Sequence, residues 1–103
     1  MMKKDIRLKK MEAQILHIFS LKAIEANDER IKMVIFTRIS LTPDYKRVKA
    51  YFKVLKIEDI DLALKALNNA KGYFKMALKE GNFLRFLPEI SFDVDEFDKK
   101  WME

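Results

Sequence analysis

The sequence of 103 residues contains no cysteine, one histidine, two glycines and two prolines. The lack of cysteine excludes disulfides, thiol catalysis and zinc sites built on thiolates, and a single histidine excludes imidazole clusters. No run of eighteen apolar residues occurs, so we expect no membrane-spanning helix. The basic start leads into an amphipathic pattern rather than the apolar block of a signal peptide. These absences predict one compact, soluble domain in the cytoplasm.

Charge is plentiful and unevenly distributed along the chain. The formal net charge is +5, yet residues 1–88 carry 19 Lys and Arg against ten Asp and Glu, while residues 89–103 carry two against six. A basic body favours a polyanionic partner, with nucleic acid first, because neutralising phosphates releases counterions. The alternative is an ordinary solvated surface rich in lysine.

Hydrophobic spacing predicts a helix followed by a hairpin. Apolar residues recur every three or four positions from Leu8 to Phe19, which indicates an amphipathic helix over about residues 5–24. The polar stretch "EANDER" is typical of a connection. Residues 32–41 are rich in β-branched and aromatic side chains, and "TPD" after them predicts a turn. In the next strand the apolar side chains Val48, Ala50, Phe52 and Val54 alternate with Tyr45, Arg47, Lys49, Tyr51 and Lys53.

From Asp59 to about residue 80 the apolar residues recur at helical spacing, which predicts a helix with Asp59 as a candidate N-cap. One straight helix would place Lys71 inside the apolar stripe, where an unpaired charge is costly. A break at Ala70-Lys71-Gly72 turns Lys71 outward. We expect Gly72 to absorb unusual backbone angles there and to permit close approach of the two helices. The alternative is a tolerated glycine in a plain helix.

A third strand is predicted after Pro88, because Ile90, Phe92 and Val94 alternate with polar residues. The order helix, strand, strand, helix, helix, strand predicts an α+β domain over residues 1–95, with helices on one face of a three-stranded sheet. Residues 96–103 are expected to be a short, flexible acidic tail. Trp101 is either loose in that tail or folded back on the core.

The C-terminal half carries a family resemblance. The Ala70-Lys71-Gly72 break followed by "YFK", and "LRFLPEISFDVD" at 84–95, resemble bacterial ribosome-binding factor A. The resemblance implies a type II KH-like αββααβ domain with an Ala-x-Gly kink (Ala70, Gly72) in place of a GXXG loop. It also implies a non-enzymatic assembly factor, which binds the immature small ribosomal subunit and its rRNA and assists late maturation, rRNA processing and cold adaptation.

Three surfaces are candidates for phosphate binding. Their residues are the N-terminal cluster within 3–10 (Arg7, Lys9 and Lys10), the outward strand cations (Arg38, Arg47, Lys49 and Lys53) and the kink (Lys71, Gly72, Lys75, Lys79 and Arg85). Folded RNA is bound mainly by shape and backbone, which suits such cations. We rank the kink above the sheet, because Glu89, Asp93 and Asp95 are expected to neutralise the strand cations. Tyr45 and Tyr51 either stack bases or pack under neighbouring side chains.

No set of side chains predicts catalysis. His17 is expected to serve packing or the surface, and the acidic group Asp93, Asp95, Glu96 and Asp98 is a solubilising end or a weak divalent-ion site. We therefore predict no enzyme, cofactor, small-molecule substrate or membrane partner, and a monomer. Two other classes remain open. One is a protein-interaction adaptor or homodimer that uses a strand edge and binds no RNA, and the other is a small enzyme with an acidic metal site.

Overall fold

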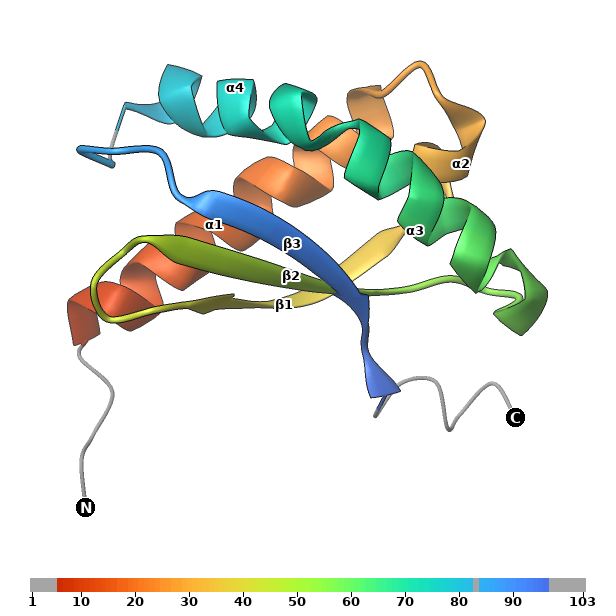
Figure 1. Cartoon of the computed structure of the whole chain (residues 1–103), viewed down its shortest axis with the longest axis horizontal. Helices are drawn as coiled ribbons and strands as arrows, with labels where there is room; N and C mark the ends of the chain where they lie inside the picture. The colour runs from red at the N-terminus through yellow and green to blue at the C-terminus, as the bar shows by residue number, and fades with distance from the viewer. Residues whose placement is uncertain (1–5, 83, 97–103) are drawn as a thin grey trace.

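A three-stranded sheet forms one layer of the molecule (Figure 1). The computed structural model describes residues 6–82 and 84–96. The strands β1 (Ile35–Leu41), β2 (Arg47–Lys53) and β3 (Glu89–Val94) lie in the order β1-β2-β3. β1 and β2 are antiparallel, as the hairpin pattern predicts, and β3 is parallel to β2. The parallel pairing follows from the long helical crossover that joins the two strands.

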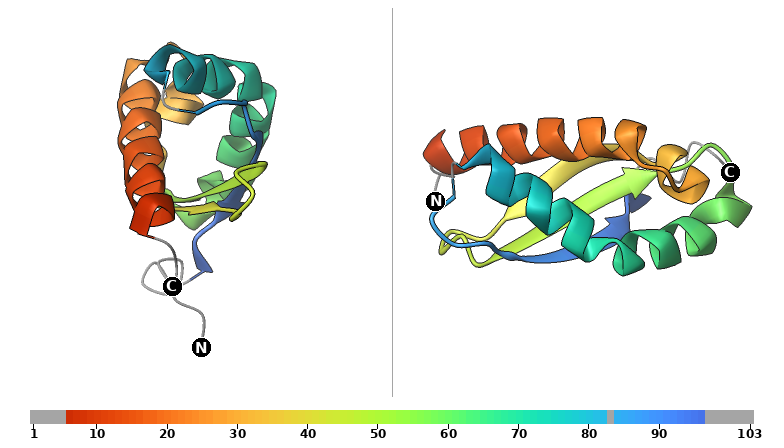
Figure 2. Two further views of the ribbon diagram at one scale, coloured as in Figure 1. Left: turned by 90° about the vertical axis from the view of Figure 1, so that its left-hand side faces the viewer. Right: turned by 90° about the horizontal axis from the view of Figure 1, so that it is seen from above.

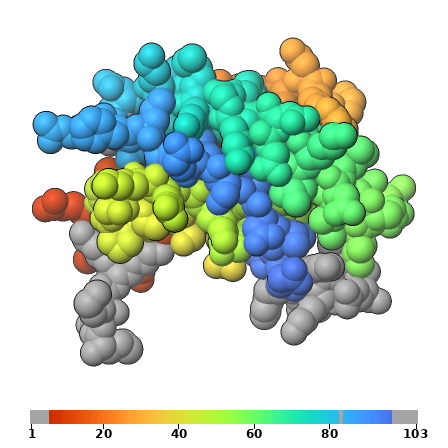
Figure 3. Space-filling model, viewed as in Figure 1, coloured from red at the N-terminus to blue at the C-terminus, as the bar shows by residue number. Residues whose placement is uncertain are grey.

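The helices all pack on one face of this sheet, and Figure 2 shows the two layers end-on. They are α1 (Ile6–Glu25), α2 (Glu29–Lys32), α3 (Ile60–Asn69) and α4 (Lys71–Gly81), with a 3-10 turn, η1, at Ile57–Asp59. In the space-filling view α4 and α3 lie along β3 (Figure 3). The α+β prediction is confirmed. In residues 6–82 and 84–96 no helix is long and apolar enough to cross a bilayer.

Four phenylalanines from four elements meet at the centre of the core. Phe19 of α1, Phe36 of β1, Phe74 of α4 and Phe92 of β3 have ring centroids 4.9 to 6.4 Å apart. All four are buried. Burying one such side chain contributes about 1.5–3 kcal/mol, so this cluster makes a large contribution to the packing of the two layers. The predicted inward residues of the second strand, from Val48 to Val54, are buried as well.

A buried carboxylate attaches α1 to β1. Glu12 is 9% exposed, and its Oε2 accepts a hydrogen bond from the backbone N–H of Leu41 at 2.8 Å. β1 is an edge strand, so that N–H has no neighbouring strand on its outer side. A buried N–H without a partner is costly, and Glu12 supplies the acceptor.

The short helix α2 begins within the connection "EANDER" and ends at Lys32, and the polar composition of that stretch did not predict it. Asp28 caps this helix, because its Oδ1 accepts a hydrogen bond from Arg30 N at 2.9 Å. The Arg30 side chain also donates to both carboxylate oxygens, at 3.0 and 2.7 Å. These side-chain hydrogen bonds lower the pKa of Asp28 below its ordinary value. The strand predicted from Lys32 consequently begins three residues later, at Ile35.

Two local predictions are wrong. Tyr45 is not an outward strand residue but a half-buried turn residue with φ 62°, packed against the core, and its N–H donates to Thr42 O at 2.8 Å. Asp59 precedes α3 but makes no side-chain cap, because its own backbone is helical (φ −87°, ψ −5°) at the end of η1. A capping side chain requires an extended backbone at that position.

Candidate nucleic-acid interface

The predicted helix break lies between α3 and α4, at Ala70. This residue has φ −103° and ψ 17°, outside the helical region. Its N–H donates to Leu67 O at 3.0 Å, and its carbonyl accepts from Phe74 N at 3.2 Å, so both helix ends remain bonded. Leu67 and Phe74 are buried while Lys71 is exposed. The change of helical phase therefore keeps the lysine out of the core, as predicted.

The role assigned to Gly72 is wrong. No glycine in the described residues has a positive φ, and a Cβ placed on Gly72 meets no atom within 4 Å. The unusual backbone angles are at Ala70, and Gly72 already lies in the first turn of α4. Neither a special conformation nor close packing of the two helices requires a glycine here. Its effect is to leave the backbone at the start of α4 bare toward solvent.

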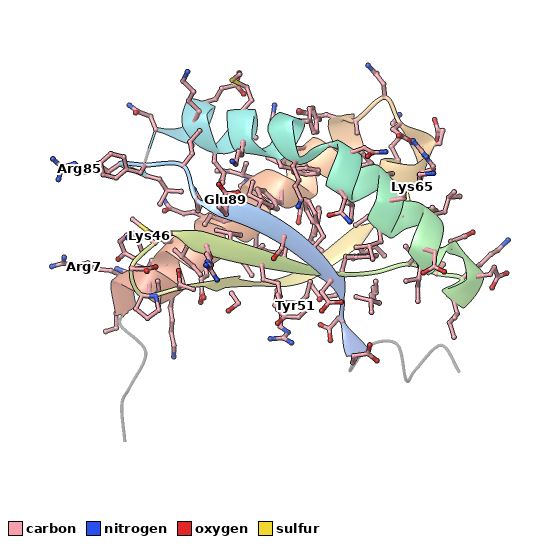
Figure 4. The ribbon with its side chains drawn as sticks, viewed as in Figure 1. Arg7, Lys46, Tyr51, Lys65, Arg85 and Glu89 are labelled. Atoms are coloured by element: carbon pink, nitrogen blue, oxygen red, sulfur yellow. The ribbon has the colours of Figure 1, made fainter. Side chains whose placement is uncertain are left out.

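The lysines of α4 are not equivalent. Lys75 is half-buried, and its Nζ lies 3.6 Å from Glu89 Oε1 at the start of β3. Lys71 and Lys79 are exposed, and neither forms an ion pair within the residues that the structure describes. Arg85 is not part of the kink surface, since it follows the opposite end of α4 (Figure 4). Of the three lysines on α4, Lys71 and Lys79 thus have no ion pair in the described residues, and the paired Lys75 lies between them.

Within residues 6–82 and 84–96 the outer face of the sheet is open, because the helices cover only the inner face (Figure 2). The expected ion pairs of Arg47, Lys49 and Lys53 with carboxylates do not form in the described part of the chain. The parallel register explains this for Lys49, since it sets Ser91 opposite Lys49 and Asp93 opposite Tyr51. Glu89 does lie opposite Arg47, but its carboxylate is paired with Lys75 instead. Cations thus remain available across the middle of this face.

Asp95 was also expected to neutralise a cation of the second strand, but it is 5% exposed and bonded elsewhere. Its Oδ2 accepts from Thr37 Oγ1 at 2.6 Å and lies 3.6 Å from Arg38 Nε. Thr37 and Arg38 sit at an irregularity in the β1–β2 pairing, which turns both side chains outward. Asp95 therefore orders Arg38 rather than the lysines of β2.

Tyr51 points away from the helices at the centre of the open face (Figure 4). The guanidinium carbon of Arg38 lies 3.7 Å from its ring centroid, and Lys49 Nζ lies at 6.0 Å. The ring is half-buried under these cations, which is the packing alternative for Tyr51. A nucleobase that approaches this face meets the plane of Arg38 before it meets the tyrosine.

The third surface lies at one end of the molecule. Arg7, Lys9 and Lys10 are exposed on the first turns of α1, whereas Lys3 and Lys4 lie outside the described residues. Figure 4 shows Arg7, Lys46 and Arg85 at this same end. Sequence reasoning did not select Lys46. Its position two residues after the predicted "TPD" turn was the only signal that pointed to it.

The remaining titratable candidates do not form a site in the described residues. His17 is exposed on α1. No three His, Cys, Asp or Glu side chains within 6–82 and 84–96 gather closely enough to hold a metal ion, and Asp98 lies outside these ranges.

Comparisons with known proteins agree with the resemblance noted in the sequence. The profile of the family "Ribosome-binding factor A" matches residues 7–103. Ribosome-binding factor A of Coxiella burnetii is 33% identical over 72 residues, which cover 70% of this chain and 60% of that protein. The protein of the same name from Coprothermobacter proteolyticus is 33% identical over 93 residues, which cover 89% of this chain and 68% of that protein. The match with the Coxiella proteins thus spans less than two thirds of their length.

Solved structures share the fold. The crystal structure of ribosome-binding factor A from Thermus thermophilus superposes with a TM-score of 0.76 at 23% identity, over 84% of this chain and 94% of that one. Thermus thermophilus coordinates fitted into a cryo-EM map of a 30S complex superpose with a TM-score of 0.69 at 24% identity, over 82% of this chain and 90% of that one. The mixed sheet and helices match this type II KH-like arrangement, with α2 as an addition to the predicted element order. Because the family profile matches residues 7–103, almost the whole of this chain, the chain belongs to the ribosome-binding factor A family.

Proposed function

We propose that this chain is a ribosome assembly factor that binds the immature small ribosomal subunit and its rRNA. In this role it assists late maturation of the subunit, including rRNA processing, and supports growth in the cold. The observation that carries the proposal is the family match over residues 7–103. The basic body of the chain supports it, since phosphate neutralisation supplies affinity without any catalytic group.

The open sheet face is the first contact that we propose. Arg47 and Lys49 are exposed there without acidic partners in the described residues, and Arg38 presents a flat cation above Tyr51. Lys53, half-buried, extends the row. These side chains suit phosphates and the outer shape of folded RNA rather than base edges. This ranking reverses the sequence-based one, because Lys75 of the kink is paired and the strand cations are not.

The kink supplies a second contact in this proposal. Lys71 and Lys79 are free along α4, and the bare backbone at Gly72 leaves room for a phosphate beside Lys71. The first turns of α1, with Arg7, Lys9 and Lys10, extend the basic surface toward the far end. We expect the protein to act by binding alone, as a cytoplasmic monomer without cofactor.

Co-sedimentation tests the function. Purified protein is mixed with immature small subunits, mature small subunits and large subunits over a range of salt concentrations. We expect it to sediment with immature small subunits at low salt and to be released as salt rises. No co-sedimentation at any low salt concentration would end the proposal.

The competing class is a protein-interaction module. β1 and β3 are the edges of the sheet, and edge strands offer unpaired backbone groups to another chain. Binding that is insensitive to ionic strength, together with large assemblies in light scattering, would favour this class over an RNA-binding factor.

A further inference from the structure

An apolar groove opens at the end of the molecule where the β1–β2 turn, α1 and the segment after α4 meet. Its volume is about 540 Å³, within the roughly 300–1,000 Å³ typical of ligand sites. The apolar lining comes from Met11, Tyr45, Leu84, Phe86 and Leu87. In the space-filling view the segment after α4 overhangs the turn at this end (Figure 3).

The turn side of the groove is held by hydrogen bonds. Asp44 Oδ1 accepts from Thr42 Oγ1 at 2.7 Å and from Lys46 N at 3.0 Å. The carbonyl of Lys46 accepts from Glu89 N at 2.8 Å, which fastens the turn to β3. Tyr45 is thereby fixed in its left-handed conformation with its ring toward the core. This wall exists before any ligand arrives.

The other wall is apolar and uncovered. Phe86 is 77% exposed and Leu87 is 42% exposed, and both line the groove. The core of the protein gains little from an aromatic ring held so far out in water, whereas a flat partner would gain a stacking surface. The Arg85 guanidinium carbon lies 6.0 Å from the Phe86 ring centroid, on the same segment.

The charge at the mouth of the groove is positive. Lys46 and Arg85 are exposed, and neither forms an ion pair in the described residues. Arg7 points out at the same end (Figure 4). Of the two acids of the lining, Glu89 is paired with Lys75. Asp44 stays ionised, because the hydrogen bond from the Thr42 hydroxyl lowers the pKa of Asp44, and it offsets only part of the positive charge of Lys46 and Arg85. An anionic partner with flat apolar parts therefore fits this groove better than a cationic or a purely apolar one.

We propose that this groove receives an unpaired nucleobase of RNA, which stacks on Phe86 while its flanking phosphates contact Arg85 and Lys46. The inference rests on the proposed function, because it assigns the RNA partner a further, single-stranded contact distant from the open sheet face. An aromatic ring beside cations is the combination that holds single strands without sequence readout.

The probe is an oligouridylate of about ten nucleotides with one central 2-aminopurine, whose fluorescence is quenched on stacking. We expect the wild-type protein to quench it and Phe86→Ala to weaken binding by about 5- to 150-fold. Phe86→Trp keeps a ring and should retain quenching. Leu55→Ala is the matched control, because Leu55 is 84% exposed and follows the far end of β2. Thermal unfolding of each variant verifies that the fold is intact.

Each result separates this inference from the proposed function. Co-sedimentation with immature subunits but no Phe86-dependent quenching leaves the function standing and overturns the groove as a base site. Quenching without co-sedimentation keeps the groove as an RNA site and overturns the function. If Phe86→Ala weakens co-sedimentation and leaves oligonucleotide quenching unchanged, the occupant is a protein and the inference is wrong.

Discussion

Single side chains decide which cations of this protein are available to a phosphate. Lys75 is held 3.6 Å from Glu89, whereas Arg47 and Lys49 face solvent without a carboxylate partner in the described residues. For Lys49 the difference comes from register, since Ser91 rather than an acid lies opposite it, whereas Glu89, which lies opposite Arg47, is paired with Lys75. A paired lysine must lose one partner to gain another, so its net contribution to RNA binding is smaller.

Gly72→Ala tests the corrected role of the glycine. The backbone at Gly72 is helical and a methyl group meets open space, so we expect the free energy of unfolding to stay the same or rise by up to about 1 kcal/mol. Urea denaturation measures this. A loss of more than about 1 kcal/mol would show that the native chain needs glycine there.

A second readout of the same variant concerns RNA. If the bare backbone beside Lys71 admits a phosphate, Gly72→Ala weakens binding to immature subunits while stability is kept. Unchanged binding in a stable variant would remove the start of α4 from the interface.

At the scale of elements, the join between α1 and the sheet depends on Glu12. Its carboxylate is the acceptor for the buried Leu41 N–H at 2.8 Å. Glu12→Ala leaves that N–H without an acceptor, and we expect it to lower the free energy of unfolding by about 1–3 kcal/mol. Urea denaturation again provides the measurement.

Glu12→Gln is the matched control, because it keeps an acceptor oxygen at nearly the same place. We expect it to lose clearly less stability than Glu12→Ala. Equal losses in the two variants would mean that the negative charge, and not the hydrogen bond, attaches α1 to β1.

The long elements were predictable because each buries one face, and this repeats apolar residues at a regular spacing along the sequence. Every inward residue predicted for β2 is buried, and the helix break was found from the phase of Lys71 alone. What failed is short and depends on particular side-chain contacts, which are local for α2 and distant along the chain for Tyr45. The helix α2 has four residues and is held by the Asp28 cap, and the inward turn of Tyr45 depends on core contacts that no local pattern shows.

The candidate site was predictable in composition but not in layout. All of the named cations in the described residues are at least partly exposed. The sequence implies this, because they alternate with apolar residues along a strand or lie opposite the apolar face of a helix. Which of them are neutralised was not predictable, because that depends on the pairing of β3 with β2. The end surface around Lys46 and Arg85 was missed for a related reason, since its parts come from three segments that only the fold brings together.

On the scale of the whole molecule, the layers separate a packed face from the face that we propose binds RNA. The helices cover one side of the sheet, and the cations of β1 and β2 occupy the other (Figure 2). The groove with Phe86 lies at one end, while Lys65 of α3 lies toward the opposite end (Figure 4). Because Lys65 lies away from both proposed contacts, variants of the open sheet face can be compared with variants near Lys65 that remove the same number of charges.

The most direct test of the account is the salt dependence of binding to immature small subunits. The double variant Arg47→Gln, Lys49→Gln removes two cations from the open sheet face, and Lys56→Gln, Lys65→Gln removes two exposed cations elsewhere. We expect the first variant to bind more weakly and to reduce the slope of log affinity against log salt by about two units. The second variant should leave the slope close to that of the wild type. Equal slopes for all three proteins, or affinity independent of salt, would contradict RNA binding through the open face.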